Sequence, residues 1–336
     1  MKLFLKSVTQ KTFFLVLLTS SLTLFFSILL VWFRPQLAVD LVRFLSPNVS
    51  PTPLEFKGLA VLGDSQSDEY RADDSRGLTY ASTTKNWVEH LVDLREINIG
   101  ENGTFEEPRR SGFAYNFARS GATTLSMIES GPHVSAAELV KEKKVNAVVI
   151  FIGANDFSPI HPTGYDAIYN ESLTEADIIR KKNDVVSGIK TAVETLHSSG
   201  DVRIILVTIP DWGRNPVIRL TYPDPLRRAK VTEVVNDINL DLKTLLTESE
   251  GTVIDINDFY ESLLDQEDKK VRVGSITLIN TLPSDNPRHF FLDDGIHAGS
   301  LVNALFAREV ILRLNDFFIP VLTPLTEAEM LSNSGL

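Results

Sequence analysis

Residues 145–156 read VNAVVIFIGAND, an almost wholly apolar run followed by a small polar cluster. Similar runs rich in β-branched residues recur at 58–62, 202–209 and 252–256, each followed by a Gly, Pro, Asp or Asn cluster. Nearly continuous apolar runs of this length are typical of strands that are buried on both faces. The four runs therefore predict the strands of a central sheet.

Helical patterns lie between these runs. The best covers residues 175–197, with a capping-box pattern over 172–175 and Gly200 just beyond its end. Weaker helical patterns cover 86–94, 136–143, 226–247 and 301–318. Alternating strands and helices predict an α/β fold with a parallel sheet covered on both sides, and a site at the carboxyl ends of the strands.

The composition excludes several classes of protein. The chain has 336 residues, 43% of them hydrophobic, so it is neither disordered nor fibrous. It has no cysteine, which excludes disulfide scaffolds, thiol catalysis and thiolate metal sites. Its 33 basic and 44 acidic residues give a net charge of −11, and no basic stripe offers a nucleic-acid surface.

The N-terminal region carries a long uncharged segment. Residues 12–33, TFFLVLLTSSLTLFFSILLVWF, form a run of 22 residues between Lys11 and Arg34. A helix of this length spans about 33 Å, enough for a hydrocarbon core of about 30 Å. Because Lys2, Lys6 and Lys11 precede it, we expect residues 1–11 in the cytoplasm and the rest of the chain outside. The segment is interpreted as a single-pass signal anchor. A cleaved signal near residues 37–39, which would give a secreted protein, is the alternative.

The rest of the chain divides into three parts. Residues 34–56 contain Pro47, Pro51 and Pro53 among Ser, Asn and Thr, and are predicted to be an extended linker. Residues 57–319 show a continuous pattern and are predicted to be one domain. Residues 320–336 form a C-terminal tail, in which a capping box from Thr326 to Glu329 predicts one short helix.

Two clusters with possible chemistry lie in the first half of the domain. The first is Gly63-Asp64-Ser65 after the first strand, where a serine can project its hydroxyl from the sheet edge. The second ends at Gly121, after a short predicted strand at 113–117, where the main-chain N–H can approach a substrate closely. Each is also compatible with an ordinary turn.

Two further clusters follow later in the chain. Asn155 comes at the end of the strand at 145–152, where its amide can donate to a developing oxyanion, although it could instead cap a turn. Asp294 lies three residues before His297, a spacing at which a carboxylate can orient an imidazole as general base. Among the six histidines, His297 alone has this spacing from an acid in a predicted strand-end loop.

The order of these clusters resembles the SGNH hydrolases, also called the GDSL esterase/lipase superfamily. The matching blocks are Gly63-Asp64-Ser65, the block ending at Gly121, Gly153-x-Asn155-Asp156 and Asp294-x-x-His297, within about residues 59–307. The resemblance implies a flavodoxin-like three-layer α/β/α fold and a carboxylic ester hydrolase that needs no cofactor or metal. One departure is Gln66, which stands where the family usually has leucine.

The resemblance also implies roles for the matching residues. Ser65 would be the nucleophile, His297 the base and Asp294 its orienter. The oxyanion hole would be formed by the backbone N–H groups of Ser65 and Gly121 and by the side chain of Asn155. An ester would be attacked by Ser65, and the acyl-enzyme would then be hydrolysed by water.

Several alternatives stay open within the site. Asp293 is a close rival to Asp294, His289 is a distant rival to His297, and Asp64 could partner the histidine but is better placed to shape its turn. The acidic residues at 68–74 do not have the spacing of an EF-hand, and no metal site is predicted.

The substrate is less well defined than the chemistry. The loops at 69–85, 157–170 and 211–224 could wall a pocket, and Trp212, Arg214 and Tyr222 in the last could contact substrate or only pack the loop. We expect a membrane-anchored hydrolase of a lipid or carbohydrate ester outside the cytoplasm. An O-acyltransferase that uses the same residues and a non-catalytic envelope-binding protein are the alternatives. The sequence predicts no oligomeric state.

Overall fold

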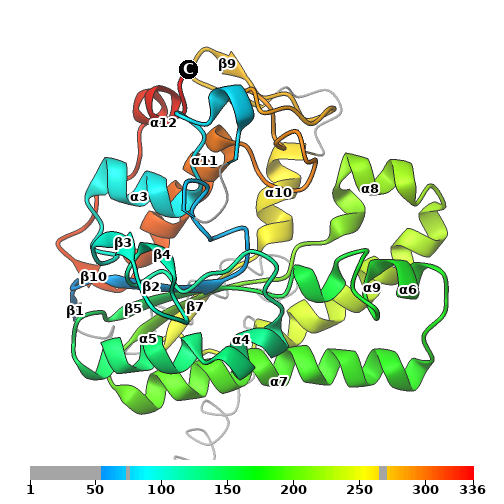
Figure 1. The fold of residues 1–336 in the computed structure, drawn as a ribbon, viewed down its shortest axis with the longest axis horizontal. Coiled ribbons are helices and arrows are strands. Elements are labelled where there is room, and N and C mark those ends of the chain that lie inside the picture. Colours follow the sequence, from blue (N-terminus) through cyan, green and yellow to red (C-terminus); the bar gives the residue numbers. More distant parts are fainter. Residues whose placement is uncertain (1–53, 73–75, 265–270) are drawn as a thin grey trace, which may run out of the picture. The chain divides into compact units, whose positions relative to one another are not determined.

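The computed structural model describes residues 54–72, 76–264 and 271–336 (Figure 1). The predicted membrane segment at 12–33 and nearly all of the predicted linker lie outside these residues. Within them, no helix has the length and apolar character needed to cross a membrane.

A parallel sheet of four strands forms the centre of the described chain. The strands β2 (Leu59–Gly63), β5 (Ala147–Phe151), β6 (Arg203–Val207) and β7 (Gly251–Ile254) lie in the order β2-β5-β6-β7. All three pairings are parallel. The four strands predicted from the apolar runs are therefore confirmed, each within a few residues of its expected ends.

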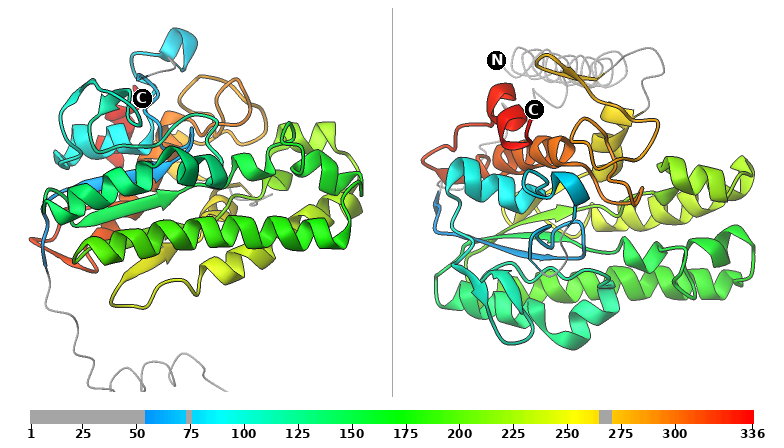
Figure 2. Two further views of the ribbon diagram at one scale, coloured as in Figure 1. Left: turned by 60° about the horizontal axis from the view of Figure 1, so that its bottom comes forward. Right: turned by 45° about the horizontal axis from the view of Figure 1, so that its top comes forward.

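Helices cover both faces of this sheet, as predicted (Figures 1 and 2). On one face lie α3 (Trp87–Arg95), α10 (Ile256–Leu264) and α11 (Ser300–Leu314). On the other lie α5 (Pro132–Lys141), α7 (Glu175–Ser199) and α9 (Pro225–Leu242). Alternate residues of β2 point to opposite faces, so Val61 packs with the first group and Leu62 with the second. Burial on both faces explains the continuous apolar runs.

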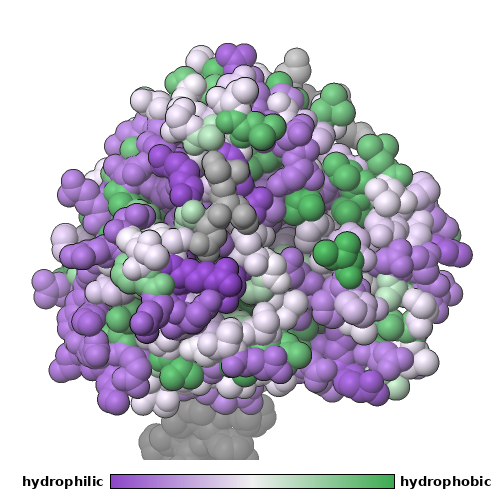
Figure 3. Space-filling model, in the orientation of Figure 1, coloured by the Kyte–Doolittle hydropathy of each residue, from purple (hydrophilic) through white to green (hydrophobic). Residues whose placement is uncertain are grey.

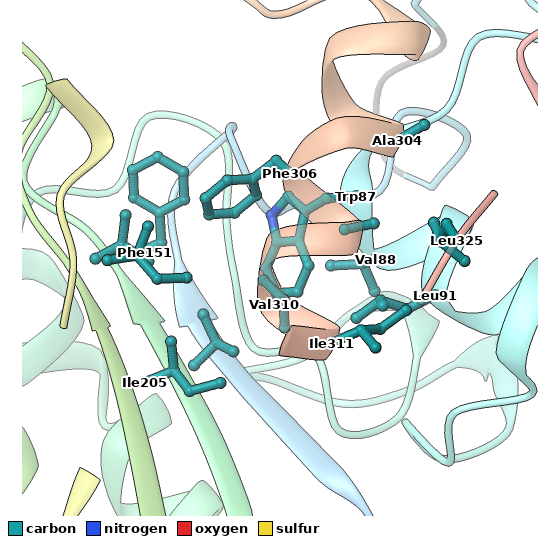
Figure 4. Packing of buried hydrophobic residues seen from close by; sticks show 14 of the residues in the cluster. Trp87, Val88, Leu91, Phe151, Ile205, Ala304, Phe306, Val310, Ile311 and Leu325 are labelled. Atoms are coloured by element: carbon teal, nitrogen blue, oxygen red, sulfur yellow. The ribbon is translucent and has the colours of Figure 1, made fainter. Parts of the chain in front are cut away.

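The core on the α3 and α11 face is built around aromatic contacts (Figure 4). The ring of Phe306 on α11 lies 5.7 Å from Trp87 on α3, edge to face, and 5.6 Å from Phe151 on β5. Trp87 has no exposed surface, and its indole N–H donates to the hydroxyl of Ser67. This packing joins α3, α11 and the loop that follows β2.

The bounds predicted for a short strand at 113–117 are wrong. Residues 111–113 instead form β4 (Ser111–Phe113), which pairs antiparallel with β3 (Asn102–Thr104). A single parallel bridge joins Asn116 to Val61, supported by backbone bonds from Val61 to Tyr115 and from Phe117 to Val61. The side chain of Asn116 accepts from the N–H of Ala118 and donates to the carbonyl of Ser67, which ties this segment to the loop after β2.

Several predicted helix ends also differ from the structure. The capping residue of α7 is Thr174, which exchanges hydrogen bonds with Asp177, and not Ser172. Helix α5 begins at Pro132, four residues early, because Pro is well suited to the first turn of a helix. Helix α11 ends at Leu314, because the chain then forms β10 (Phe318–Ile319), which pairs with β1 (Leu54–Glu55).

The C-terminal residues pack on the body of the described chain. The predicted capping box at Thr326 opens α12 (Glu327–Asn333) as expected. Both carboxylate oxygens of Glu329 accept from Arg95 on α3, at 2.9 and 2.8 Å, and Met330 has no exposed surface. Figure 2 shows α12 beside α3 and α11. Segment 320–336 is thus held by both an ion pair and apolar burial.

The remaining elements are short. They are α4 (Thr124–Ser130), α6 (Tyr165–Tyr169), α8 (Pro216–Thr221), β8 (Arg272–Val273), β9 (Ile276–Thr277) and the 3₁₀ turns η1 (Leu78–Tyr80), η2 (Asn155–Phe157) and η3 (Trp212–Arg214). On the face seen in Figure 3, hydrophobic residues lie in several separate groups among hydrophilic ones.

Candidate active site

Ser65 lies on a tight turn directly after β2. The carbonyl of Asp64 accepts from the N–H groups of Ser67 and Asp68, at 3.0 and 2.9 Å, and its Oδ1 accepts from the N–H of Gln66 at 3.0 Å. A Cβ on Gly63 would lie 2.8 Å from the carbonyl oxygen of Phe151, so only glycine fits there. These contacts hold the half-buried Ser65 at the carboxyl end of the first strand.

Asp64 shapes this turn from a fully buried position. Burial raises the pKa of Asp64 from 3.8 to about 7, although the hydrogen bond from Gln66 opposes the rise. Its hydrogen bond to the N–H of Gln66 agrees with the predicted role in the turn.

The second block is tied to the first. The Oδ2 atom of Asp68 accepts from the N–H of Ser120 at 2.8 Å. Gly121 follows with a φ of +82°, a left-handed conformation that favours glycine, and no atom lies within 4 Å of the place where a Cβ would stand. In the described part of the chain, the N–H groups of Ser65 and Gly121 donate to no backbone carbonyl, so both are available to a substrate.

The third block is tied to the second. The side-chain amide of Asn155 donates to the carbonyl of Ala122 at 3.0 Å, next to Gly121. The buried carboxylate of Asp156 accepts from both the N–H and the hydroxyl of Thr124, at 2.9 and 3.1 Å, where α4 begins. These bonds place the Asn155 amide beside the loop of Gly121 and leave its second N–H for another acceptor.

The fourth block forms a close acid–histidine pair. The Nδ1 atom of His297 lies 2.6 Å from Oδ2 of Asp294, and Oδ1 of Asp294 accepts from the N–H groups of Ile296 and His297, at 2.8 and 2.9 Å. Burial alone would raise the pKa of Asp294, but the hydrogen bonds and charge of His297 lower it to about 2. Asp294 therefore stays ionised and fixes the imidazole.

The alternatives to Asp294 and His297 make other contacts. Asp293 is exposed, and its N–H donates to Asp285. The Nδ1 atom of His289 lies 2.7 Å from the carbonyl of Leu282. The structure thus joins Asp294, and not Asp293, to His297.

Arg76 is a site residue that the sequence did not indicate. Its Nη1 atom lies 3.4 Å from Oδ2 of Asp294 and 3.1 Å from Nδ1 of His297, and its Nη2 atom lies 3.4 Å from the hydroxyl of Ser120. Because Nδ1–H of His297 donates to the same Oδ2 atom, Arg76 and His297 share one carboxylate oxygen. Arg76 is half-buried, and its place in the loop after the nucleophile is not a signal that the sequence alone makes specific.

Comparison with known families decides the class of the chain. Residues 59–310 match the family described as GDSL-like lipase/acylhydrolase. The chain belongs to this family. It is a carboxylic ester hydrolase by that membership, and the SGNH resemblance predicted from the four blocks is confirmed.

Solved structures with some likeness to this family member include three lipases and esterases. The lipase Lip_vut3 from a goat rumen metagenome is 14% identical with a TM-score of 0.47, and the match covers 76% of this chain and 96% of that one. The esterase EstA from Pseudoalteromonas sp. is 14% identical, with a TM-score of 0.38 and coverage of 77% and 96%. The extracellular lipase from Streptomyces rimosus is 17% identical, with a TM-score of 0.41 and coverage of 75% and 99%. No functionally curated protein matches the chain.

The structure of this GDSL-family hydrolase does not join Ser65 to His297 by a hydrogen bond. The Nε2 atom of His297 is buried and has no hydrogen-bond partner among the described residues. Among the described residues, no group of three or more His, Asp or Glu side chains could hold a metal ion.

The three residues named in the predicted pocket loop at 211–224 lie in two different places. Trp212 and Arg214 line a cavity beside Gln66. Tyr222 instead packs against Tyr165 and Tyr169, with ring centroids 4.9 Å from each, so its role is packing of the loop.

Proposed function

We propose that the chain hydrolyses carboxylic esters through an acyl-enzyme at Ser65, with His297 as base and Asp294 as its orienter. The observation that carries these roles is the 2.6 Å contact between His297 and Asp294, on a loop that Arg76 joins to the Ser120–Gly121 loop. The free N–H groups of Ser65 and Gly121 and the amide of Asn155 complete an oxyanion hole.

The reaction follows from these groups. Nε2 of His297 takes the Ser65 proton as Oγ bonds to the ester carbonyl carbon. The carbonyl oxygen becomes an oxyanion, which accepts from the three donors. The C–O bond to the alcohol then breaks, and the imidazolium returns its proton to the leaving alkoxide. Water repeats the sequence on the acyl-enzyme and releases the carboxylic acid.

We further propose that the enzyme acts outside the cytoplasm on a lipid or carbohydrate ester, tethered by residues 12–33. The support is the uncharged run of 22 residues preceded by three lysines, and the proline-containing residues 34–56 that follow. Protease treatment of intact cells tests this: the domain should be cleaved from outside and should fractionate with membranes. A domain that is protected in intact cells would contradict the proposal.

Hydrolysis of p-nitrophenyl acetate by the full chain tests the site. Ser65→Ala should lower kcat by at least about 10³-fold, because the triad acts as a unit. Ser130→Ala removes an exposed hydroxyl that bonds only to its own helix and should leave the rate unchanged. Product analysis with and without a sugar acceptor shows whether water or a sugar hydroxyl receives the acyl group. Equal rates for wild type and Ser65→Ala would contradict the proposal.

A further inference from the structure

Tyr70 lies in the same loop as Ser65 and has no exposed surface. Its ring stands edge to face against the imidazole of His297, with the ring centroids 6.2 Å apart and an angle of 85° between the planes. The reaction proposed for Ser65 and His297 does not use this tyrosine. The contact nevertheless joins the loop of the nucleophile directly to the residue that serves as base.

The same ring also contacts Arg76. The central carbon of the guanidinium lies 5.5 Å from the centre of the Tyr70 ring, inside the limit of about 6 Å for a cation–π contact. The Nη1 atom of Arg76 lies 3.4 Å from Oδ2 of Asp294, the oxygen that Nδ1 of His297 also approaches. Tyr70 therefore contacts both of the side chains that meet at this carboxylate oxygen.

The hydroxyl of Tyr70 is held at the far end of the ring. It donates to the carbonyl of Ala298, the residue after His297, at 3.0 Å. The side-chain amide of Asn303 on α11 donates to this hydroxyl at 3.3 Å and to the same carbonyl at 2.8 Å. Burial raises the pKa of Tyr70 above its ordinary value, so the hydroxyl keeps the proton that it donates. Tyr70 thus contacts both the imidazole and the backbone that follows it.

The backbone of Tyr70 is fixed to the start of α3. Its N–H donates to Oε2 of Glu89 at 3.2 Å, and the same oxygen accepts from the N–H of Asn86 at 2.8 Å. The side-chain amide of Asn86 donates to the carbonyl of Asp68 at 2.8 Å. These bonds restrain the loop near Tyr70, so the ring meets the imidazole from a defined position.

The imidazole needs such a restraint because its hydrogen bonds lie on one side. Nδ1 contacts Asp294, whereas Nε2 has no hydrogen-bond partner among the described residues. A bond at one ring nitrogen restrains one edge of the ring, and packing against a neighbour restrains the rest. The restraint matters because a displacement of about 1 Å in a site can lower a rate by about 100-fold.

We propose that Tyr70 is a positioning residue for the hydrolysis, and that its ring holds the imidazole of His297 and the guanidinium of Arg76 in place around Asp294. Tyr70 acts through His297 and is not assigned a contact with the reacting atoms. The inference rests on the proposed function, because it requires His297 to serve as base for Ser65.

Steady-state kinetics with the full chain and p-nitrophenyl acetate test the role of the ring. Tyr70→Leu removes the ring and should lower kcat by about 10–100-fold with KM unchanged, because the imidazole loses its position. Tyr70→Phe keeps the ring and should stay within about fivefold of the wild-type kcat, since it loses only the bonds of one hydroxyl. Tyr70→Met also removes the ring with a flexible side chain that fills gaps, and makes the same comparison if Tyr70→Leu does not fold.

Tyr169→Leu is the matched control. Tyr169 is also buried, its hydroxyl also bonds to the backbone, and its ring also lies near an arginine, Arg227, at 5.8 Å. Its ring packs against Tyr165 and Tyr222 instead of His297, so kcat of the folded variant should be that of wild type. Thermal unfolding of each variant shows that folded protein is compared.

A double variant separates positioning from a general loosening of the fold. Residues that act as a unit have strongly non-additive effects, so Tyr70→Leu should lower the residual rate of His297→Ala no further. An equal further loss in that background would overturn the proposal, as would wild-type kcat in folded Tyr70→Leu or an equal loss in Tyr70→Phe. These results leave the proposed function intact. No Ser65-dependent hydrolysis by wild type would overturn the proposed function and the role of Tyr70 together.

Discussion

The Oδ2 atom of Asp294 lies 2.6 Å from the Nδ1 atom of His297. The other carboxylate oxygen of Asp294 accepts two backbone N–H groups of the same short turn, so the turn itself orients the acid. The spacing of three residues therefore lets one turn bring the acid and the imidazole together, and Arg76 contacts the same carboxylate oxygen from another loop.

Asp294→Asn should lower kcat by about 10³–10⁴-fold, because an amide no longer holds the imidazole in its working tautomer. Asp293→Asn is the matched control, since this neighbouring carboxylate is exposed and should leave kcat unchanged. Steady-state kinetics on both variants check the assignment. A large loss in Asp293→Asn with normal activity in Asp294→Asn would reverse it.

Asn155→Ala should lower kcat by about 10²–10³-fold, or about 2.7–4 kcal/mol of transition-state stabilisation, if its amide stabilises the oxyanion. Asn170→Ala removes an exposed amide that bonds only to Asp166, and should have no effect on kcat. Thermal unfolding of both variants shows whether the fold is retained. A folded Asn155→Ala enzyme of normal kcat would remove Asn155 from the mechanism.

Arg76→Ala should lower kcat by about tenfold, equivalent to about 1.4 kcal/mol, because the guanidinium joins the Asp294 loop to Ser120. Arg76→Lys should not restore the rate, since one ammonium cannot make the two separate contacts of a planar guanidinium. Measuring kcat and KM separately distinguishes positioning, which lowers kcat, from substrate binding, which raises KM. Full activity in Arg76→Lys would show that only the positive charge matters.

Asp64 should make the stability of the fold depend on pH. Its pKa is about 7 in the folded chain against an ordinary 3.8, so the folded state binds more protons than the unfolded state between these values. This contribution to the free energy of unfolding is fully present below about pH 4 and is lost as the pH rises through about 7. The slope is at most about 1.4 kcal/mol per pH unit.

Asp64→Asn removes this titrating carboxyl group, so the free energy of unfolding should depend less on pH than it does in wild type. Urea unfolding of the two proteins at pH 4.5, 5.5 and 7 measures the difference. Glu69, whose pKa burial also raises to about 7, is present in both proteins and cancels in the comparison. Parallel pH profiles for the two proteins would show that Asp64 stays ionised in the fold.

The parallel sheet and the site blocks could be predicted because each has a local signal. Because β5 is buried on both faces, its sequence is a continuous apolar run. The turns after β2 and β5 carry the blocks of Ser65 and Asn155. The pairing of Leu54–Glu55 with Phe318–Ile319 could not be predicted, because strands of two residues have no periodicity. Arg76 was missed for a related reason: its contact with Asp294 joins positions 218 residues apart.

The nucleophile is identified by the mass of the full chain after reaction with a fluorophosphonate, compared between wild type and Ser65→Ala. We expect one phosphonyl adduct on wild type, located on Ser65 by peptide mapping, and none on folded Ser65→Ala. An adduct on another residue, or no adduct on folded wild type, would contradict the assignment of Ser65 as the nucleophile.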